Sequence, residues 1–158
     1  MKTLKVLFAL GIMLGFAVLA NSQGKGKQVE RPFKGQFYSV VVQEYPTYEI
    51  LSITGNATHL GLVANCEMTF IRPVPPPPLI GHLDGILLAA NGDYVHFYCP
   101  VTLNVTDPVT RSGTMSGTFC FDGGTGRFTG CYGGGQVTGT FSMTEDWAKW
   151  TVDGTITY

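Results

Sequence analysis

Basic residues are scarce over most of this 158-residue sequence. After residue 34 the basic side chains are those of Arg72, Arg111, Arg127 and Lys149, and ten acidic residues oppose them. Four bases against ten acids leave a net charge of −6 in this part of the chain. Such a charge repels a phosphate backbone, and no basic stripe offsets it. The sequence therefore excludes nucleic acid as a partner.

The sequence also lacks the spacing of a metal site and of a common hydrolytic nucleophile. It has no Cys-x-x-Cys pair, its three histidines are scattered, and no Gly-x-Ser-x-Gly motif occurs. We therefore expect neither a metal nor another cofactor. The even number of cysteines favours disulfide bonds or buried thiols over zinc, with three pairings left open. The disulfide candidates are Cys66, Cys99, Cys120 and Cys131.

Long apolar runs are absent except at the N-terminus. There, two lysines precede an apolar run that ends at Leu19, and a small residue, Ala20, follows it. This pattern is typical of a secretory signal peptide, and without stop-transfer charges it predicts no stable membrane insertion after cleavage. We expect a secreted or periplasmic protein. The expected organisation is a signal peptide over 1–20, a flexible basic leader over 21–31 and a single domain over 32–158.

Stretches free of glycine and proline are short. Only 62–72 and 140–153 are long enough for a three-turn helix, and both are rich in residues that favour strands. The sequence therefore predicts an all-β fold. The expected strands are 33–43, 48–54, 60–71, 83–90, 93–104, 113–121, 130–142 and 148–157.

Apolar and polar side chains alternate along 93–99, 113–121 and 130–142, as they do in half-buried strands. Several glycines share the apolar face of 130–142, which indicates a sharply curved wall. Eight strands in meander order favour a small closed antiparallel barrel over an open sandwich, because closure removes exposed edges.

Two segments between the strands carry distinct turn chemistry. Asn91-Gly92 is a strong signal for a two-residue type I′ hairpin turn, in which both central residues need a positive φ. Pro73 and the prolines of 75–78 form a stiff segment that cannot join a hydrogen-bonded ladder. We expect this segment to form a loop at the rim of the barrel.

Several motifs resemble those of a known barrel family. The Gly-Gly-Thr-Gly-x-Phe segment at 123–128 and the Gly-Asp-Tyr-Val-His segment at 92–96 are similar to segments of allene oxide cyclases and dirigent proteins. Further landmarks at 32–35, 55–61 and 89–93 resemble uncharacterised secreted bacterial proteins with the same barrel. The resemblance implies an eight-stranded antiparallel β-barrel, calycin-like in architecture, which can form a homo-oligomer.

The resemblance also implies candidates for catalysis. In the cyclases a pocket Glu on a Tyr-Glu-Ile-Asn strand steers charge, and Tyr-Glu-Ile recurs here at 48–50, followed by Leu51 in place of Asn. His96 and Tyr94 share the polar face of one strand, where they suit acid–base chemistry or a solvated outer surface. The residues to test for catalysis are therefore His96, Tyr94 and Glu49.

A barrel of this size can hold one small ligand at its mouth, or its side chains can fill the lumen completely. The leading hypothesis is an exported barrel that binds a hydrophobic or amphipathic small molecule. The alternatives are an isomerase or cyclase acting on a lipid-like substrate, and a structural or interaction module without a ligand. The residues expected to line the ligand site are Leu62, Met68, Phe70, Val95, Phe97, Met115 and Phe119.

Overall fold

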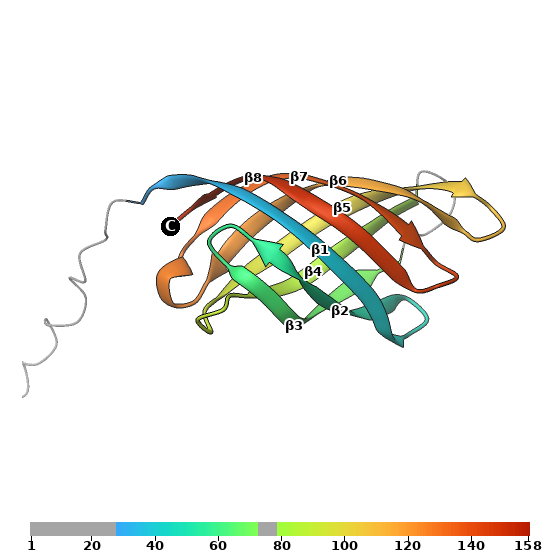
Figure 1. Cartoon of the computed structure of the whole chain (residues 1–158), viewed down its shortest axis with the longest axis horizontal. Coiled ribbons are helices and arrows are strands. Elements are labelled where there is room, and N and C mark those ends of the chain that lie inside the picture. The colour runs from blue at the N-terminus through green and yellow to red at the C-terminus, as the bar shows by residue number, and fades with distance from the viewer. Residues whose placement is uncertain (1–27, 73–78) are drawn as a thin grey trace, which may run out of the picture.

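A computed structural model describes residues 28–72 and 79–158 and shows a closed, eight-stranded antiparallel barrel (Figure 1). Each strand pairs with its neighbours in chain order, and the first pairs with the last to close the ring. This confirms the all-β barrel expected from the sequence. The strands are β1 (Glu30–Glu44), β2 (Tyr48–Ala57), β3 (Gly61–Ile71), β4 (Leu79–Leu88), β5 (Tyr94–Asp107), β6 (Ser112–Gly124), β7 (Tyr132–Ser142) and β8 (Trp147–Thr157).

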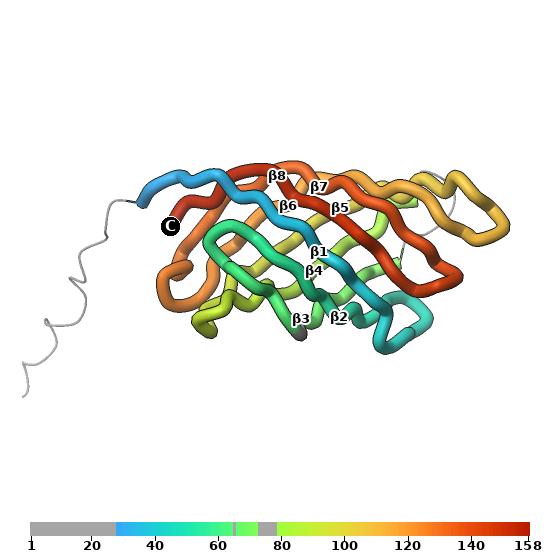
Figure 2. Tube along the Cα trace, viewed as in Figure 1, coloured from blue at the N-terminus to red at the C-terminus, as the bar shows by residue number. Residues whose placement is uncertain are grey.

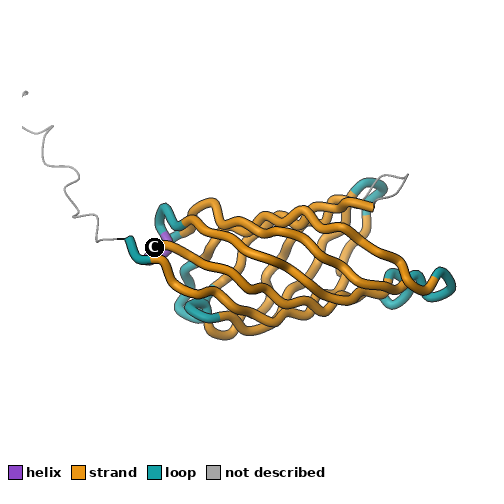
Figure 3. The backbone as a smooth tube through the Cα atoms, turned by 90° about the horizontal axis from the view of Figure 1, so that it is seen from above, coloured by secondary structure: helices purple, strands orange, loops and turns teal. Residues whose placement is uncertain are grey.

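The strands run obliquely to the long axis of the barrel (Figure 2), and the strands of opposite walls cross when the molecule is seen from above (Figure 3). Such a tilt accompanies the closure of a sheet into a small barrel. Because the strands run up and down, alternate connections lie at the same end. The β1–β2, β5–β6 and β7–β8 connections, together with the end of β3 and the start of β4, surround one end, here called the mouth.

Aromatic side chains fill the middle of the barrel. Phe97 is fully buried and packs against Phe119, Phe121 and Trp150, with ring centroids 5.4, 6.2 and 5.8 Å away. Along β5 the interior residues alternate with more exposed ones, as the sequence predicts for 93–99. Apolar burial of this kind is the main stabilising contribution to such a fold.

Glycines make room for these rings. Gly154 of β8 and Gly135 of β7 are strand partners of each other. Gly154 also pairs with Phe33 of β1 on one side, and Gly135 pairs with Phe119 of β6 on the other. With no side chains on the two central positions, the rings of Phe33 and Phe119 approach to 6.0 Å between centroids. The glycines of β7 and β8 thus allow close packing at this wall.

The end opposite the mouth is closed by side chains. A short 3-10 helix, η1 (Gly126–Phe128), follows β6 and inserts the fully buried Phe128 into the barrel. Its ring packs against Tyr158 at a centroid distance of 5.1 Å. Nearby, His59 Nε2 lies 3.0 Å from the carbonyl oxygen of Pro32 and joins the β2–β3 turn to β1.

The β4–β5 turn differs from the expected type I′ turn. Gly92 has a φ of +88°, but Asn91 is not among the residues with positive φ. Gly92 N donates to Ala89 O, and Ala89 N donates to Asp93 O, which describes a three-residue loop. A type I turn followed by a left-handed glycine produces this pattern. The extra residue in this loop lets β4 and β5 join with only one residue, Gly92, in the left-handed conformation.

The expected disulfide bonds are absent, since all four cysteines are free thiols. Cys99 points into the barrel and Cys120, although on the neighbouring strand, is exposed on the outside. Cys66 Sγ accepts a hydrogen bond from Leu88 N, and Cys131 Sγ donates to Gly123 O. Burial raises the pKa of the Cys66 and Cys131 thiols and that of Cys99 to about 12. The buried thiols therefore act as small apolar side chains.

Some expectations fall on parts of the chain outside the described residues. These are the signal peptide over 1–20, most of the leader over 21–31 and the proline-rich loop of 73–78. β1 begins at Glu30, two residues before the expected start of the domain. In the described part of the chain, no helix has the length and hydropathy needed to cross a membrane.

Candidate functional site

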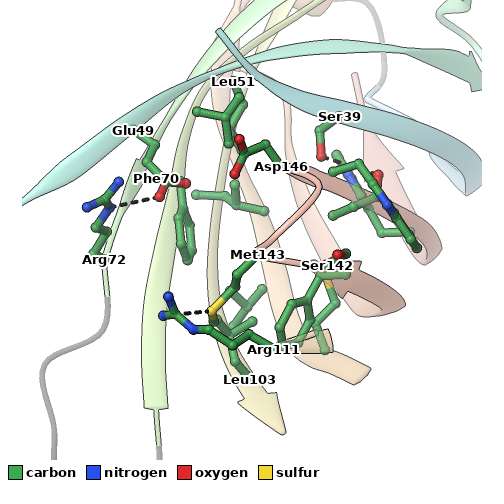
Figure 4. A pocket seen from close by; sticks show the side chains of 18 of the residues that line it. Ser39, Glu49, Leu51, Phe70, Arg72, Leu103, Arg111, Ser142, Met143 and Asp146 are labelled. Carbon is green, nitrogen blue, oxygen red and sulfur yellow. Dashed lines mark hydrogen bonds and ion pairs between the residues drawn. The ribbon is translucent and has the colours of Figure 1, made fainter. Parts of the chain in front are cut away.

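The mouth of the barrel contains a pocket of about 470 Å³ (Figure 4). All eight strands contribute to it, because each either ends or begins at this end. Its deeper walls are apolar, and Trp150 separates it from the packed aromatic core. The apolar lining residues include Leu51, Phe70, Leu83, Val101, Leu103, Met115, Phe141 and Trp150.

Three charged side chains form a linked group at one side of the pocket. Arg72 Nε lies 2.8 Å from Glu49 Oε1, and Arg72 Nη2 lies 2.9 Å from Glu44 Oε2. Glu49 is the most buried member, with only 19% of its side chain exposed. Glu49 points inward because it shares the inner face of β2 with Leu51. Arg72 holds two carboxylates at once, so the group keeps a net negative charge.

Burial raises the pKa of Glu49 above its ordinary value of 4.5. Arg72 acts in the opposite direction through its charge and its hydrogen bond, whereas Glu44 and Asp146 add to the increase. The pocket therefore contains a carboxyl group that takes up a proton more readily than a solvated glutamate. Such a group can exchange a proton with a bound molecule.

Two loops of the mouth are joined beside the pocket. Met143 N donates to Arg111 O at 3.2 Å, and Thr144 Oγ1 donates to Thr110 O at 2.6 Å. Arg111 and Asp146 have φ angles of +49° and +56°, a region that non-glycine residues seldom adopt. Both residues line the pocket, on opposite sides in Figure 4.

Comparison with known proteins identifies the fold. No family model matches the chain, and no curated protein matches it. Among solved structures, the pterocarpan synthase dirigent protein GePTS1 superimposes with a TM-score of 0.58 and 12% identity, over 84% of this chain and 87% of that one. The chain has a dirigent-like barrel fold. At this identity the likeness concerns the fold alone.

The dirigent-like barrel brings three of the sequence candidates into its pocket. Glu49, Phe70 and Met115 all line it. Four other apolar candidates are at most 1% exposed and belong to the packed core rather than to the lining of the pocket. These four are Met68, Val95, Phe97 and Phe119. The aromatic core therefore fills the part of the lumen in which the sequence placed much of the ligand site.

Leu62 does not line the lumen, since it lies on the outer face and is 61% exposed. Strict alternation would place Leu62 on the same face as Met68, six residues further along β3. Between the pairs Gly55–Val63 and Ile53–Cys66, however, β3 advances three residues while β2 advances two. This β-bulge reverses the orientation of every side chain before it, so Val63 and not Leu62 points inward.

His96 and Tyr94 lie on the outer face of β5, away from the pocket. His96 Nε2 is 3.2 Å from Asp84 Oδ1, and both side chains are more than 40% exposed. The histidine therefore belongs to a solvated surface pair, the second of the two interpretations open from the sequence. Across the described residues, no cluster of three or more His, Cys, Asp or Glu side chains is arranged to hold a metal ion.

Sequence reasoning missed four charged residues of the site. These residues lie at strand ends or in turns, where alternation carries no information about direction. In a meander barrel, however, alternate turns meet at the same end, and that rule would have grouped them. The missed residues are Glu44, Arg72, Arg111 and Asp146.

Substituting Arg72→Gln is expected to raise the pKa of Glu49 still further, because the group that favours its carboxylate is lost. Carboxyl NMR, with the signal assigned through Glu49→Gln, measures this pKa. Lys149→Gln, which removes a charge from the outer surface, serves as the control. An unchanged Glu49 pKa in Arg72→Gln would show that the ion pair does not govern this group.

The raised pKa of Glu49 also makes the free energy of unfolding depend on pH. A folded pKa above the unfolded one means that the native state binds the proton more tightly. Glu49 therefore contributes stability below pH 4.5 that is lost as the pH rises through its folded pKa. The Glu49→Gln variant should lose this part of the pH dependence.

Proposed function

We propose that the protein is an exported barrel that binds a hydrophobic or amphipathic small molecule at its mouth. The observation that carries the proposal is the pocket of about 470 Å³, which has an apolar interior and charged groups at its rim. This volume lies within the range of about 300–1,000 Å³ typical of small-molecule sites. The signal-like sequence at 1–20 supports a secreted or periplasmic location.

The distribution of side chains suits such a ligand. Apolar surface that leaves water contributes roughly 25 cal/mol per Å², so the walls around Leu103 and Met115 would stabilise an apolar body. A few charged groups at the rim would orient the polar end of the molecule. The packed core around Phe97 provides a floor, so a ligand enters and leaves through the mouth.

Leu51→Trp is expected to weaken binding about tenfold or more, because the larger side chain occupies the pocket. The neutral fluorescent probe N-phenylnaphthylamine, titrated into the purified protein, measures the affinity. Leu62→Trp introduces the same side chain on the outer face and should leave the affinity unchanged. Circular dichroism checks that both variants fold, and Leu103→Phe replaces Leu51→Trp if that variant does not.

Native mass spectrometry of protein from its own host provides the second measurement. A copurifying molecule of lipid-like mass, lost in Leu51→Trp, would identify the natural ligand. If the probe does not bind and no molecule copurifies, the proposal fails and the interaction module without a ligand takes its place.

One observation favours a second function, that of an isomerase or cyclase acting on a lipid-like substrate. Glu49 is a half-buried carboxyl group inside the pocket with a raised pKa, which suits general acid–base catalysis. His96 and Tyr94 have no place in this alternative, because they face outward. If a copurified molecule is chemically altered by the wild-type protein and not by Glu49→Gln, and both bind it, the catalytic function is supported. Recovery of an unaltered molecule supports binding alone.

A further inference from the structure

Apolar side chains are exposed to solvent around the mouth of the barrel. Val109, in the β5–β6 turn, has 86% of its surface exposed, and a hydrogen bond of 2.8 Å from its N–H to Asp107 Oδ1 stabilises this turn. Ile71 is the last residue of β3 and Ile80 lies near the start of β4, and they are 47% and 46% exposed. The mouth therefore presents apolar surface that the fold itself does not cover.

Two tyrosines extend this surface along the mouth. Tyr45 lies in the β1–β2 turn and Tyr48 begins β2, and their rings stack with centroids 4.4 Å apart. Tyr48 pairs in register with Ile71, so it lies on the outer face beside that isoleucine. Both tyrosines are half-buried, which leaves part of each ring in solvent. A tyrosine suits the boundary between an apolar phase and water, because its ring is apolar and its hydroxyl is polar.

These side chains follow the opening of the pocket around the barrel. They come from β1, β2, β3, β4 and the β5–β6 turn, which are consecutive neighbours in the closed sheet. Figure 1 shows the β1–β2 and β5–β6 turns at the same end of the molecule. The outer faces of β6 and β7 differ, since they expose hydroxyl side chains such as Thr114, Ser116 and Thr138. The exposed apolar residues at the mouth, here called the apolar rim, are Val42, Tyr45, Tyr48, Ile71, Ile80 and Val109.

The position of the apolar rim indicates what covers it. Because its members are distributed around an opening, a partner that packed against one side of the barrel would leave part of the rim in water. A lipid bilayer that faces the mouth covers them together, and burial of their apolar surface in the bilayer interface stabilises the contact.

The charges at the mouth indicate the kind of lipid. Acidic residues outnumber the two arginines at this end, Arg72 and Arg111. An acidic surface of this kind is repelled by an anionic bilayer, whereas a zwitterionic bilayer does not oppose it. The acidic residues at this end are Glu44, Glu49, Asp107, Glu145 and Asp146.

We propose that the mouth of the barrel docks reversibly on a zwitterionic lipid bilayer through the apolar rim. This inference rests on the proposed binding function and adds the surface with which the pocket exchanges its ligand. With the mouth against the bilayer, an amphipathic molecule passes between the membrane and the pocket without crossing bulk water. The rings of Tyr45 and Tyr48 would lie at the level of the headgroups, where aromatic side chains of membrane proteins gather.

Flotation of the purified protein with phosphatidylcholine vesicles measures the docking. Wild-type protein should float with the vesicles. The double variant Ile71→Thr and Ile80→Thr should bind about tenfold or more weakly, because it buries less apolar surface, while threonine retains the preference for a strand. Val109→Ser should also weaken binding, and because this residue lies in an exposed turn it replaces the double variant if circular dichroism shows that the latter does not fold.

The matched control is the double variant Leu62→Thr and Ile86→Thr. It removes two exposed apolar side chains from the outer faces of the same two strands, β3 and β4, away from the mouth. Vesicle binding should remain intact in this control. Absence of wild-type flotation, an equal loss in the control, or binding that requires added phosphatidylglycerol overturns the proposal.

Two further measurements separate docking from other roles. Sedimentation velocity shows whether Ile71→Thr and Ile80→Thr change the oligomeric state; such a change with unaltered vesicle binding makes the rim an interface between copies and overturns the proposal. Binding of N-phenylnaphthylamine without vesicles should be the same in wild type and in this variant, because neither isoleucine lines the pocket. Loss of docking with intact probe binding by wild type overturns docking alone, whereas a wild-type protein that does not bind the probe counts against the pocket function.

Discussion

Phe97→Ala is expected to lower the free energy of unfolding by about 3–5 kcal/mol, the cost of removing a buried aromatic ring and leaving a cavity. Phe97 is fully buried and contacts three other aromatic residues, so no single neighbour can fill the space. The barrel also limits how far the backbone can move into the cavity, because each strand is hydrogen-bonded to a neighbouring strand on both sides. Urea unfolding followed by tryptophan fluorescence measures the loss.

The adjacent residue provides the control. Tyr98 follows Phe97 on β5 but faces outward, with 37% of its surface exposed and its hydroxyl 3.0 Å from His82 Nδ1. Tyr98→Ala should cost about 1 kcal/mol or less, the scale of an exposed hydrogen bond and of strand propensity. A similar loss in both variants would contradict the view that the interior aromatic cluster holds the barrel together.

Gly135→Ala is expected to destabilise the protein by more than about 3 kcal/mol, beyond the usual range for overpacking. An added Cβ would lie 2.5 Å from Gly154 Cα and closer still to the carbonyl oxygen of Asp153. Both atoms belong to the backbone of β8, so no side chain can move aside to relieve the clash. Thermal and urea unfolding measure the change.

Gly130→Ala serves as the control, because it replaces a glycine at a position where an added Cβ causes no steric clash. Gly130 has a φ of +69°, but a Cβ there would meet nothing within 4 Å. Its substitution should cost about 1–2 kcal/mol, the penalty for a left-handed backbone conformation. If Gly135→Ala proves no worse than Gly130→Ala, then close approach of the strands is not the reason for glycine in this wall.

The strands were predictable because each carries its own signal. Alternation along β5, β6 and β7 indicated both the presence of these strands and the face that each presents to the interior. Alternation failed at β3, where the bulge before Cys66 shifts the pattern by one residue and exposes Leu62. A bulge is set by pairing with a neighbouring strand, and one strand alone does not reveal it.

The site was predictable only in part. Glu49 was found through a resemblance and Met115 through alternation, and both line the pocket. Arg72 and Arg111 lie at or beyond strand ends, so their directions depend on the ion pairs and loop contacts of the assembled mouth. The prediction of disulfide bonds was wrong for a similar reason. The number of cysteines does not indicate whether each thiol points into the barrel or out of it.

The order of amino acids was enough to establish an all-β chain, about eight strands, a glycine-rich wall and the inner face of most strands. These features follow from local preferences for backbone angles and from burial of apolar side chains, which act residue by residue. Only the folded barrel determines how much of the lumen the aromatic side chains fill, which end contains the pocket and which charged side chains lie together there. Those features depend on distances between strands remote in sequence, which only closure of the barrel establishes.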